Sequence, residues 1–150
     1  MLFRSPIARI LGSASVHEDL IDSYRAADAD FDYALEERWV REEGWLKIVP
    51  SAIESAASDA GIGLDQIDHV ALHGSTSTAR ALAKRLNIEA AKFVDPMQGS
   101  CGDTGAAHPL LLLTQALAAA GNKERILVVG FGQGSDAIIV ETTEIGRAHV

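Results

Sequence analysis

RILVVGFGQGSDAIIV, residues 125–140, is the stretch that decides the fold of this chain. It contains two runs of apolar and β-branched residues, each of the length and composition of a strand. Only the short glycine-rich turn 132–135 separates them. A turn this short joins two antiparallel neighbours. The stretch therefore predicts a β-hairpin near the end of the chain.

The segment before this hairpin predicts an unusual helix. AAHPLLLLTQALAAAG, residues 106–121, is apolar on nearly every side when it is drawn as a helix. A helix without a polar face is usually covered on all sides. Proline is tolerated in the first turn, so Pro109 indicates a start near His108 or an early kink. We expect this helix to be buried in the middle of a layered structure.

The rest of the chain alternates strands and helices. We expect a strand at 7–16, an amphipathic helix at 48–60, a strand at 67–74, a helix capped by Ser75, and a short strand at 91–96 closed by Pro96. An acidic excursion over residues 16–44 interrupts the pattern. The order predicts an α/β protein whose mixed sheet packs against a central helix between layers.

Composition excludes several classes of function. The formal net charge of −8 argues against nonspecific nucleic-acid binding, which needs a cationic surface. No apolar run approaches the length of a membrane span. The single cysteine excludes an internal disulfide and a multi-cysteine zinc site, and it fits a reducing cytoplasm. We expect no metal site. The N-terminal residues lack the architecture of a signal peptide.

Polar residues follow predicted strands or precede a predicted helix at three places. These are His73, then Asp103 with Thr104, and then the Gly132–Gln133–Gly134 turn. Singly, each has an ordinary explanation: a satisfied polar histidine, a helix N-cap, and a turn that needs positive φ. Functional sites of α/β proteins lie at such strand ends. We therefore expect the three turns to converge on one pocket.

Taken together, DHVALHGSTSTARALAKRL (68–86), GDTGAAHPLLLLTQAL (102–117) and residues 125–140 resemble the C-terminal half of a thiolase-superfamily condensing enzyme. The resemblance is nearest to the hydroxymethylglutaryl-CoA synthase and ketoacyl synthase III branch. There, a strand ends in a catalytic His, a turn containing Asn begins the buried helix, and a glycine turn lies in the last hairpin. DYALEERWVREEGWLKIV (32–49) resembles the segment that bacterial and archaeal relatives place before this half.

The resemblance implies that two similar halves of the enzyme contribute different catalytic residues. The catalytic cysteine belongs to the first half, of which only the last strand, within residues 1–15, is expected here. His73 and Asp103 are then the expected catalytic residues. The backbone at Gly132, Gln133 and Gly134 is expected to face the oxyanion of an acyl-enzyme. Cys101 lies where the family has no nucleophile, so we expect it to be a small buried filler.

Two departures from the family pattern bear on the reaction. Asp103 stands where the family has Asn, and an ionised carboxylate accepts hydrogen bonds but cannot donate them. Asp103 could hold His73 in one tautomer, donate if protonated, or mark a changed or lost reaction. HGST after the strand also lacks the expected Pro or Asn. The resemblance implies cationic residues that recognise the adenine nucleotide of the substrate. Arg80 and Lys84 on the helix after His73 are the expected ones, although a solvated helix face explains them at least as well.

These observations give a leading hypothesis and two alternatives. The first is the C-terminal part of an acyl-CoA condensing acyltransferase similar to hydroxymethylglutaryl-CoA synthase, dimeric when intact and inactive as residues 1–150 alone. It needs no resident cofactor, because acyl-CoA or an acyl carrier protein thioester is its substrate. The second is a non-catalytic thiolase-like subunit or scaffold that pairs with a cysteine-bearing partner. The third is an independent ligand-binding domain.

The chain is thus divided into four expected parts. Residues 1–15 hold the last strand of a missing N-terminal half, 16–44 the acidic excursion, and 45–143 the thiolase-like half-domain. Residues 144–150 contain IGRAHV, a peptide that a widely used sequencing-library adapter encodes. We therefore expect that tail to be non-native.

Overall fold

A four-stranded mixed sheet forms the centre of the computed structural model, which describes residues 6–21 and 23–144. The strand order is β1 (Ala8–His17), β6 (Gly134–Thr142), β5 (Arg125–Gly132), β4 (His69–Leu72). β4 and β5 are parallel, and the other pairs are antiparallel. The predicted hairpin is confirmed: Gly132 pairs with Gly134 across the tip. The predicted non-native tail, apart from Glu144, lies outside the described residues.

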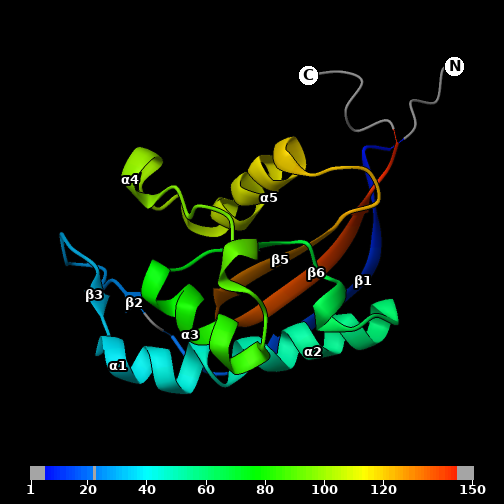
Figure 1. Ribbon diagram of the computed structural model, residues 1–150. Helices are drawn as coiled ribbons and strands as arrows, with labels where there is room; N and C mark the ends of the chain where they lie inside the picture. The colour runs from blue at the N-terminus through cyan, green and yellow to red at the C-terminus, as the bar shows by residue number, and fades with distance from the viewer. Residues whose placement is uncertain (1–5, 22, 145–150) are drawn as a thin grey trace, which may run out of the picture.

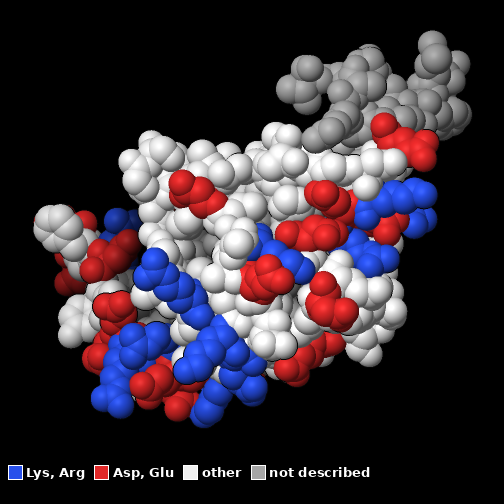
Figure 2. Space-filling view, in the orientation of Figure 1, with Lys and Arg blue, Asp and Glu red and all other residues white. Residues whose placement is uncertain are grey.

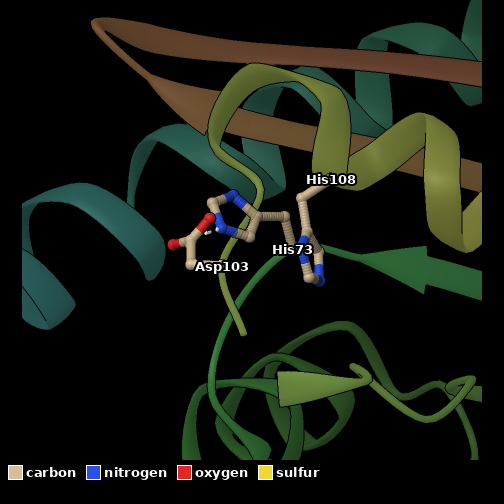
Figure 3. Close-up of side chains that lie close together, drawn as sticks. All are labelled: His73, Asp103 and His108. Carbon is tan, nitrogen blue, oxygen red and sulfur yellow. Dashed lines mark hydrogen bonds and ion pairs between the residues drawn. The ribbon is translucent and has the colours of Figure 1, made fainter. Parts of the chain in front are cut away.

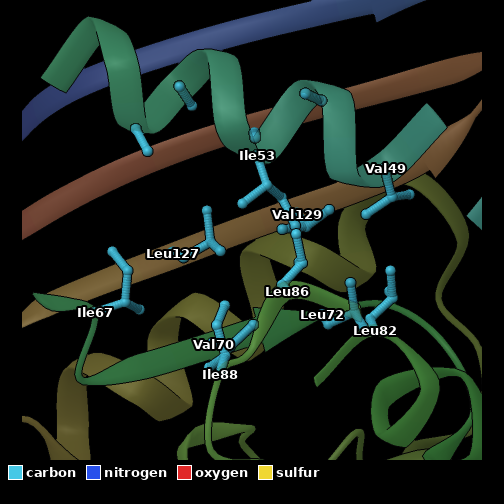
Figure 4. Close-up of a cluster of buried hydrophobic side chains, with 14 of the residues drawn as sticks. Val49, Ile53, Ile67, Val70, Leu72, Leu82, Leu86, Ile88, Leu127 and Val129 are labelled. Carbon is cyan, nitrogen blue, oxygen red and sulfur yellow. The ribbon is translucent and has the colours of Figure 1, made fainter. Parts of the chain in front are cut away.

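Helices cover both faces of this sheet (Figure 1). α2 (Ile48–Ala60) and α3 (Thr76–Leu86) lie on one face, and α5 (His108–Ala119) lies on the other. Successive side chains of a strand point to opposite faces, so each strand supplies both cores. Leu127 and Val129 pack towards α2 and α3 (Figure 4), whereas Ile126 and Val128 pack towards α5. The fold is α/β around a mixed sheet, as predicted, with helices on both faces.

The packing of α2 on the sheet depends on one glycine. A Cβ at Gly12 in β1 would lie 2.5 Å from the backbone nitrogen of Ala60 and 2.7 Å from the carbonyl oxygen of Ala56. Helix and strand backbones therefore approach more closely here than any side chain allows. This close approach brings the apolar face of α2 onto the sheet, with Val49 and Ile53 almost fully buried.

The apolar α5 is covered on one side only within the described chain. His108, Leu112 and Ala116 are its buried residues, while the Leu110 residue is 58% exposed. The helix begins at His108 with Pro109 in its first turn, as predicted. The layer expected on its outer side is not formed by residues 6–21 or 23–144.

Shorter elements connect these layers. They are β2 (Ser23–Tyr24), β3 (Tyr33–Ala34), α1 (Glu37–Trp39), a π-helical turn Val40–Trp45, α4 (Gln98–Cys101), and 3₁₀ turns Leu64–Gln66, Ala90–Lys92 and Gly105–Ala107. The predicted strand at 91–96 is wrong. Only Phe93 forms a bridge, to Val70, because a 3₁₀ turn precedes it and Pro96 follows. In the described part of the chain, no helix combines the length and the apolar character that crossing a membrane requires.

Candidate functional site

One cavity of about 520 Å³ is lined by residues from all three of the polar turns predicted from the sequence. His73 enters it directly after β4, Asp103 enters from the turn before α5, and the residues 132–134 enter from the hairpin tip. These segments are far apart in the sequence and meet because β4 and β5 are adjacent and parallel, so their carboxyl ends share one edge. The predicted convergence of the three turns is therefore observed.

His73 and Asp103 are in direct contact (Figure 3). The His73 Nε2 atom lies 3.1 Å from Asp103 Oδ2. The other carboxylate oxygen, Oδ1, accepts the backbone N–H of Gly105 at 2.7 Å. That backbone hydrogen bond, helped by His73, holds the pKa of Asp103 below its usual value. An ionised carboxylate only accepts, so the shared proton belongs to Nε2 of the imidazole.

The carboxylate of Asp103 does not cap α5, which was the simpler expectation. The 3₁₀ turn Gly105–Ala107 lies between it and the helix, and the N-cap position, Ala107, has no side-chain hydrogen bond. The hydrogen bond from Gly105 instead closes a local turn of the kind that Asp residues form. This turn fixes the carboxylate so that its second oxygen faces His73.

His108 is a buried histidine of the site that the sequence does not reveal as functional. Its side chain is fully buried, and its ring centroid lies 4.9 Å from that of His73. Nδ1 accepts the N–H of Thr104 at 3.3 Å, and Nε2 donates to the carbonyl of Pro96 at 2.8 Å. The ring therefore links Pro96 and Thr104, two points of the loop before α5, through hydrogen bonds. The only sequence signal is a histidine at the start of an apolar helix.

These side chains also form a group of possible metal ligands. One ligand atom each from His73, Asp103 and His108 lies within 4.8 Å of the others. However, both nitrogens of His108 are already hydrogen-bonded within the loop. The arrangement therefore suits proton transfer at His73 better than coordination of a metal.

The hairpin tip forms the opposite wall of the cavity. Gly134 has a φ of +120°, and a Cβ there would lie 2.1 Å from the carbonyl oxygen of Val16. Only glycine allows this conformation and this approach to β1. A Cβ at Gly132 would meet no other atom within 4 Å, so the main chain at that position borders open space.

A second pair of polar side chains lies in the same cavity. Ser15 on β1 and Asp136 on β6 are directly opposed in the sheet, and the Ser15 hydroxyl donates to Asp136 Oδ1 at 2.5 Å. The cavity thus contains two carboxyl groups, those of Asp103 and Asp136. None of the described residues that line it is Lys, Arg or Cys.

The remaining predicted residues lie outside this cavity. Arg80 borders a separate cavity of about 430 Å³ between α3 and the segment 90–96, and Lys84 is exposed further along α3. Lysines and arginines gather over the α1 and α3 side of the molecule (Figure 2). The prediction that Cys101 is a buried filler is wrong. Cys101 is exposed, because it ends the short α4, which has no buried residue.

Comparison with protein families and curated sequences gives consistent matches. The family described as 3-Oxoacyl-[acyl-carrier-protein (ACP)] synthase III C terminal matches residues 57–141. The chain is 41% identical over 90 residues to the beta-ketoacyl-[acyl-carrier-protein] synthase III of Limosilactobacillus reuteri, covering 57% of this chain and 27% of that protein. The enzyme of the same name from Latilactobacillus sakei is 36% identical over 88 residues, with the same coverage. The chain thus spans about a quarter of these relatives.

Solved structures share the fold at low sequence identity. The 3-oxoacyl-[acyl-carrier-protein] synthase III of Aquifex aeolicus matches with a TM-score of 0.70 and 18% identity, covering 93% of this chain and 46% of that one. The Pseudomonas aeruginosa enzyme FabH gives 0.74 and 16%, covering 89% and 44%. OleA of Xanthomonas campestris gives 0.70 and 20%, covering 91% and 40%. These matches show a thiolase-like fold.

Proposed function

The chain belongs to the family of 3-oxoacyl-[acyl-carrier-protein] synthase III C-terminal domains, and on that premise we propose that it is the imidazole-bearing half of an acyltransferase of the condensing-enzyme type. The acyl donor is a thioester, of CoA or of an acyl carrier protein. A cysteine outside residues 1–150 takes the acyl group first. His73 then moves a proton in the second step.

One observation carries this proposal. His73 lies in a cavity with a hydrogen-bonded carboxylate on one side and a glycine-rich main-chain turn on the other, but no described residue lining it is a cysteine. Covalent acyl transfer from a thioester needs a nucleophile as well as a base. The imidazole can serve as acid and base, and the backbone of Gly132 to Gly134 is suited to approach a developing oxyanion. The missing group is therefore the nucleophile.

The outer face of α5 is the proposed docking site for the cysteine-bearing half. An apolar helix that is half exposed loses water-exposed apolar surface when a second layer covers it. Leu110 is an exposed leucine of α5, at 58% exposure. A partner layer would cover it.

Substrate recognition and assembly belong to the same proposal. Arg80 and Lys84 would contact the anionic phosphates of CoA or the acidic surface of an acyl carrier protein. The intact enzyme is proposed to be a cytoplasmic dimer. The narrower hydroxymethylglutaryl-CoA synthase specificity has no support from the relatives named above. Carbon–carbon bond formation is one of two acceptor chemistries compatible with the proposal, the other being acyl transfer to oxygen or nitrogen.

The test uses the complete protein that contains this chain, or the chain together with the polypeptide that supplies the cysteine. Mass spectrometry after mixing with acyl-CoA measures the acyl-enzyme, and product analysis measures the second step. We expect His73→Ala to reduce the second step by about 10²–10⁴-fold, the usual range for a general base. His69→Gln, at the other end of β4, is the matched control. Unchanged turnover in His73→Ala would instead support the non-catalytic subunit.

A further inference from the structure

Resting on that proposed function, we infer that the acyl acceptor of this enzyme is a neutral or cationic molecule with an O–H or N–H group, an alcohol or an amine. The final step would then form an ester or an amide rather than a carbon–carbon bond. Two observations lead to this inference. They are the donor and acceptor pattern of His73 with Asp103, and the charge of the cavity.

The first observation concerns which groups can donate a hydrogen bond. The Nε2–H of His73 is engaged by the Asp103 carboxylate at 3.1 Å, and that carboxylate only accepts. The dyad therefore offers no free donor to an oxygen in the cavity. A carbon nucleophile made from a thioester places negative charge on the thioester oxygen, and that charge needs donors. Here the oxyanion would meet a carboxylate instead.

The same pair suits a general base. His73 Nδ1 has no hydrogen-bond partner among the described residues, so its lone pair is available for a proton. When the ring takes a proton from an O–H or N–H group it becomes positively charged. The Asp103 carboxylate beside it stabilises that charge, by Coulomb attraction and through the hydrogen bond. The pair thus favours proton removal from a heteroatom.

The second observation is the charge of the cavity. Asp103 and Asp136 both line it, and its described lining contains no Lys or Arg. An anionic acceptor, such as a malonyl thioester with its free carboxylate, would enter this field against two like charges. A neutral alcohol enters without that cost, and an ammonium group would be attracted. The Ser15–Asp136 pair also provides polar partners for such an acceptor.

The chemical step balances without a further reagent. The acceptor oxygen or nitrogen attacks the carbonyl carbon of the acyl-cysteine while His73 takes its proton. The carbon–sulfur bond then breaks as the tetrahedral intermediate collapses. The sulfur leaves as a thiolate and regains its proton from the imidazolium of His73. The products are the ester or amide and the free thiol, and no electrons are transferred.

The experiment first isolates the acyl-enzyme of the complete protein and then offers acceptors in separate arms. The probes are ethanol, ethylamine and malonyl-CoA, with heat-treated acyl-enzyme as the control for uncatalysed aminolysis. We expect ester or amide to form at least tenfold faster than in the His73→Ala enzyme, and no 3-ketoacyl product. A 3-ketoacyl product from malonyl-CoA at an equal or higher rate would overturn the inference, as would hydrolysis alone in every arm. Failure to form any acyl-enzyme would contradict the proposed function itself.

Asp103→Asn tests the positioning role of the carboxylate. The amide keeps the size of the side chain and its acceptor for Gly105 N–H, but it presents an N–H donor and carries no charge. We expect ester or amide formation to fall by about 100-fold, within the usual contribution of acid–base catalysis, and the ratio of 3-ketoacyl product to ester or amide to rise.

Asp68→Asn is the matched control for this variant. Asp68 accepts a backbone N–H, that of Arg125, at the opposite end of β4. A purely structural role of Asp103 would lower all products equally, whereas the inference requires the product ratio to change. An unchanged product ratio in Asp103→Asn would therefore contradict it.

Discussion

The imidazole of His73 donates its Nε2–H to the Asp103 carboxylate across 3.1 Å, and this contact joins the end of β4 to the turn before α5. The two side chains differ in exposure, 18% for His73 and 60% for Asp103. Solvent therefore reaches the pair mainly at Asp103. A contact of this kind contributes little to folding, so its value lies in the charge that it places beside the imidazole.

A double-mutant cycle of these two residues tests whether their contact serves catalysis rather than folding. For His73→Ala, Asp103→Ala and the double variant we expect a coupling free energy of unfolding below about 1 kcal/mol, the range for solvent-exposed pairs. Acyl transfer by the complete enzyme should fall by about 10²-fold or more in each single variant. Urea unfolding and turnover measure the two quantities. A coupling of several kcal/mol would show that the pair is mainly structural.

His108→Leu is expected to destabilise the fold strongly. The substitution removes the partner of the Thr104 N–H, which belongs to an exposed residue, and of the Pro96 carbonyl, which is partly buried. An unsatisfied buried group costs about 1–3 kcal/mol, so we expect a loss of about 1–3 kcal/mol in urea unfolding. The loop that carries Asp103 should also lose protection from hydrogen exchange.

His69→Leu is the control for that variant. His69 contacts Glu124 at 2.7 Å in a partly exposed position, so its loss should cost about 1 kcal/mol or less. Equal destabilisation by the two substitutions would contradict the anchoring role of His108.

Local sequence patterns were sufficient for the regular elements. The hairpin, α2 and α3 are where periodicity and turn residues predict them, and Ser75 accepts the N–H of Thr78 as its cap. Such signals depend only on residues that are close together in the sequence. The convergence of the three polar turns was predictable because strand ends of an α/β sheet meet at one edge.

Features that depend on distant contacts were not predictable in this way. The hydrogen bonds of His108 join Pro96 and Thr104 through a loop without regular structure. The segment 91–96 has strand-like composition but pairs through Phe93 alone. Cys101 is exposed because α4 stands away from both cores. In each case the outcome is set by tertiary packing rather than by local propensity.

Gly12→Ala should disrupt the packing between β1 and α2. The added methyl would lie 2.5 Å from a backbone atom of Ala60, which cannot move aside as a flexible side chain could. Overpacking of this kind costs about 1–3 kcal/mol or more. Ser13→Ala is the control, because Ser13 is exposed and only its backbone N–H bonds to Asp59. The free energy of unfolding, measured in urea, should be lower for Gly12→Ala than for Ser13→Ala by at least about 1 kcal/mol.

Protonation of the Glu141 carboxylate should lower the stability of the fold as the pH falls. The hydrogen bond from Arg9, at 2.6 Å, is the main reason that the pKa of Glu141 is lowered in the folded state. A group with a lowered folded pKa stabilises the fold above its unfolded pKa. That contribution is lost as the pH falls towards the folded value. Urea unfolding between pH 7 and pH 3 should therefore show a decline that Glu141→Gln reduces.

Glu54→Gln provides the comparison for this pH series. Glu54 is exposed on α2, and its variant should keep the pH dependence of the unsubstituted chain. If Glu141→Gln and Glu54→Gln gave the same pH dependence, the Arg9–Glu141 contact would have no part in acid stability.

The last prediction separates the two sides of α5. Leu112 is fully buried against the sheet, whereas Leu110 is 58% exposed on the outer side. Leu112→Ala should cost about 2–5 kcal/mol of unfolding free energy, the usual range for a core leucine. Leu110→Glu should leave the stability of the chain within about 0.5 kcal/mol, as surface substitutions do. It should nevertheless abolish binding of the cysteine-bearing half, because a charge would be buried in an apolar contact.

Size-exclusion chromatography and titration calorimetry with the cysteine-bearing half measure that binding. Glu54→Lys is the control, because Glu54 lies on α2, on the opposite face of the sheet from α5. It should bind like the unsubstituted chain. Normal binding by Leu110→Glu would mean that the outer face of α5 does not meet the other half. The nucleophile would then have to reach His73 from another direction.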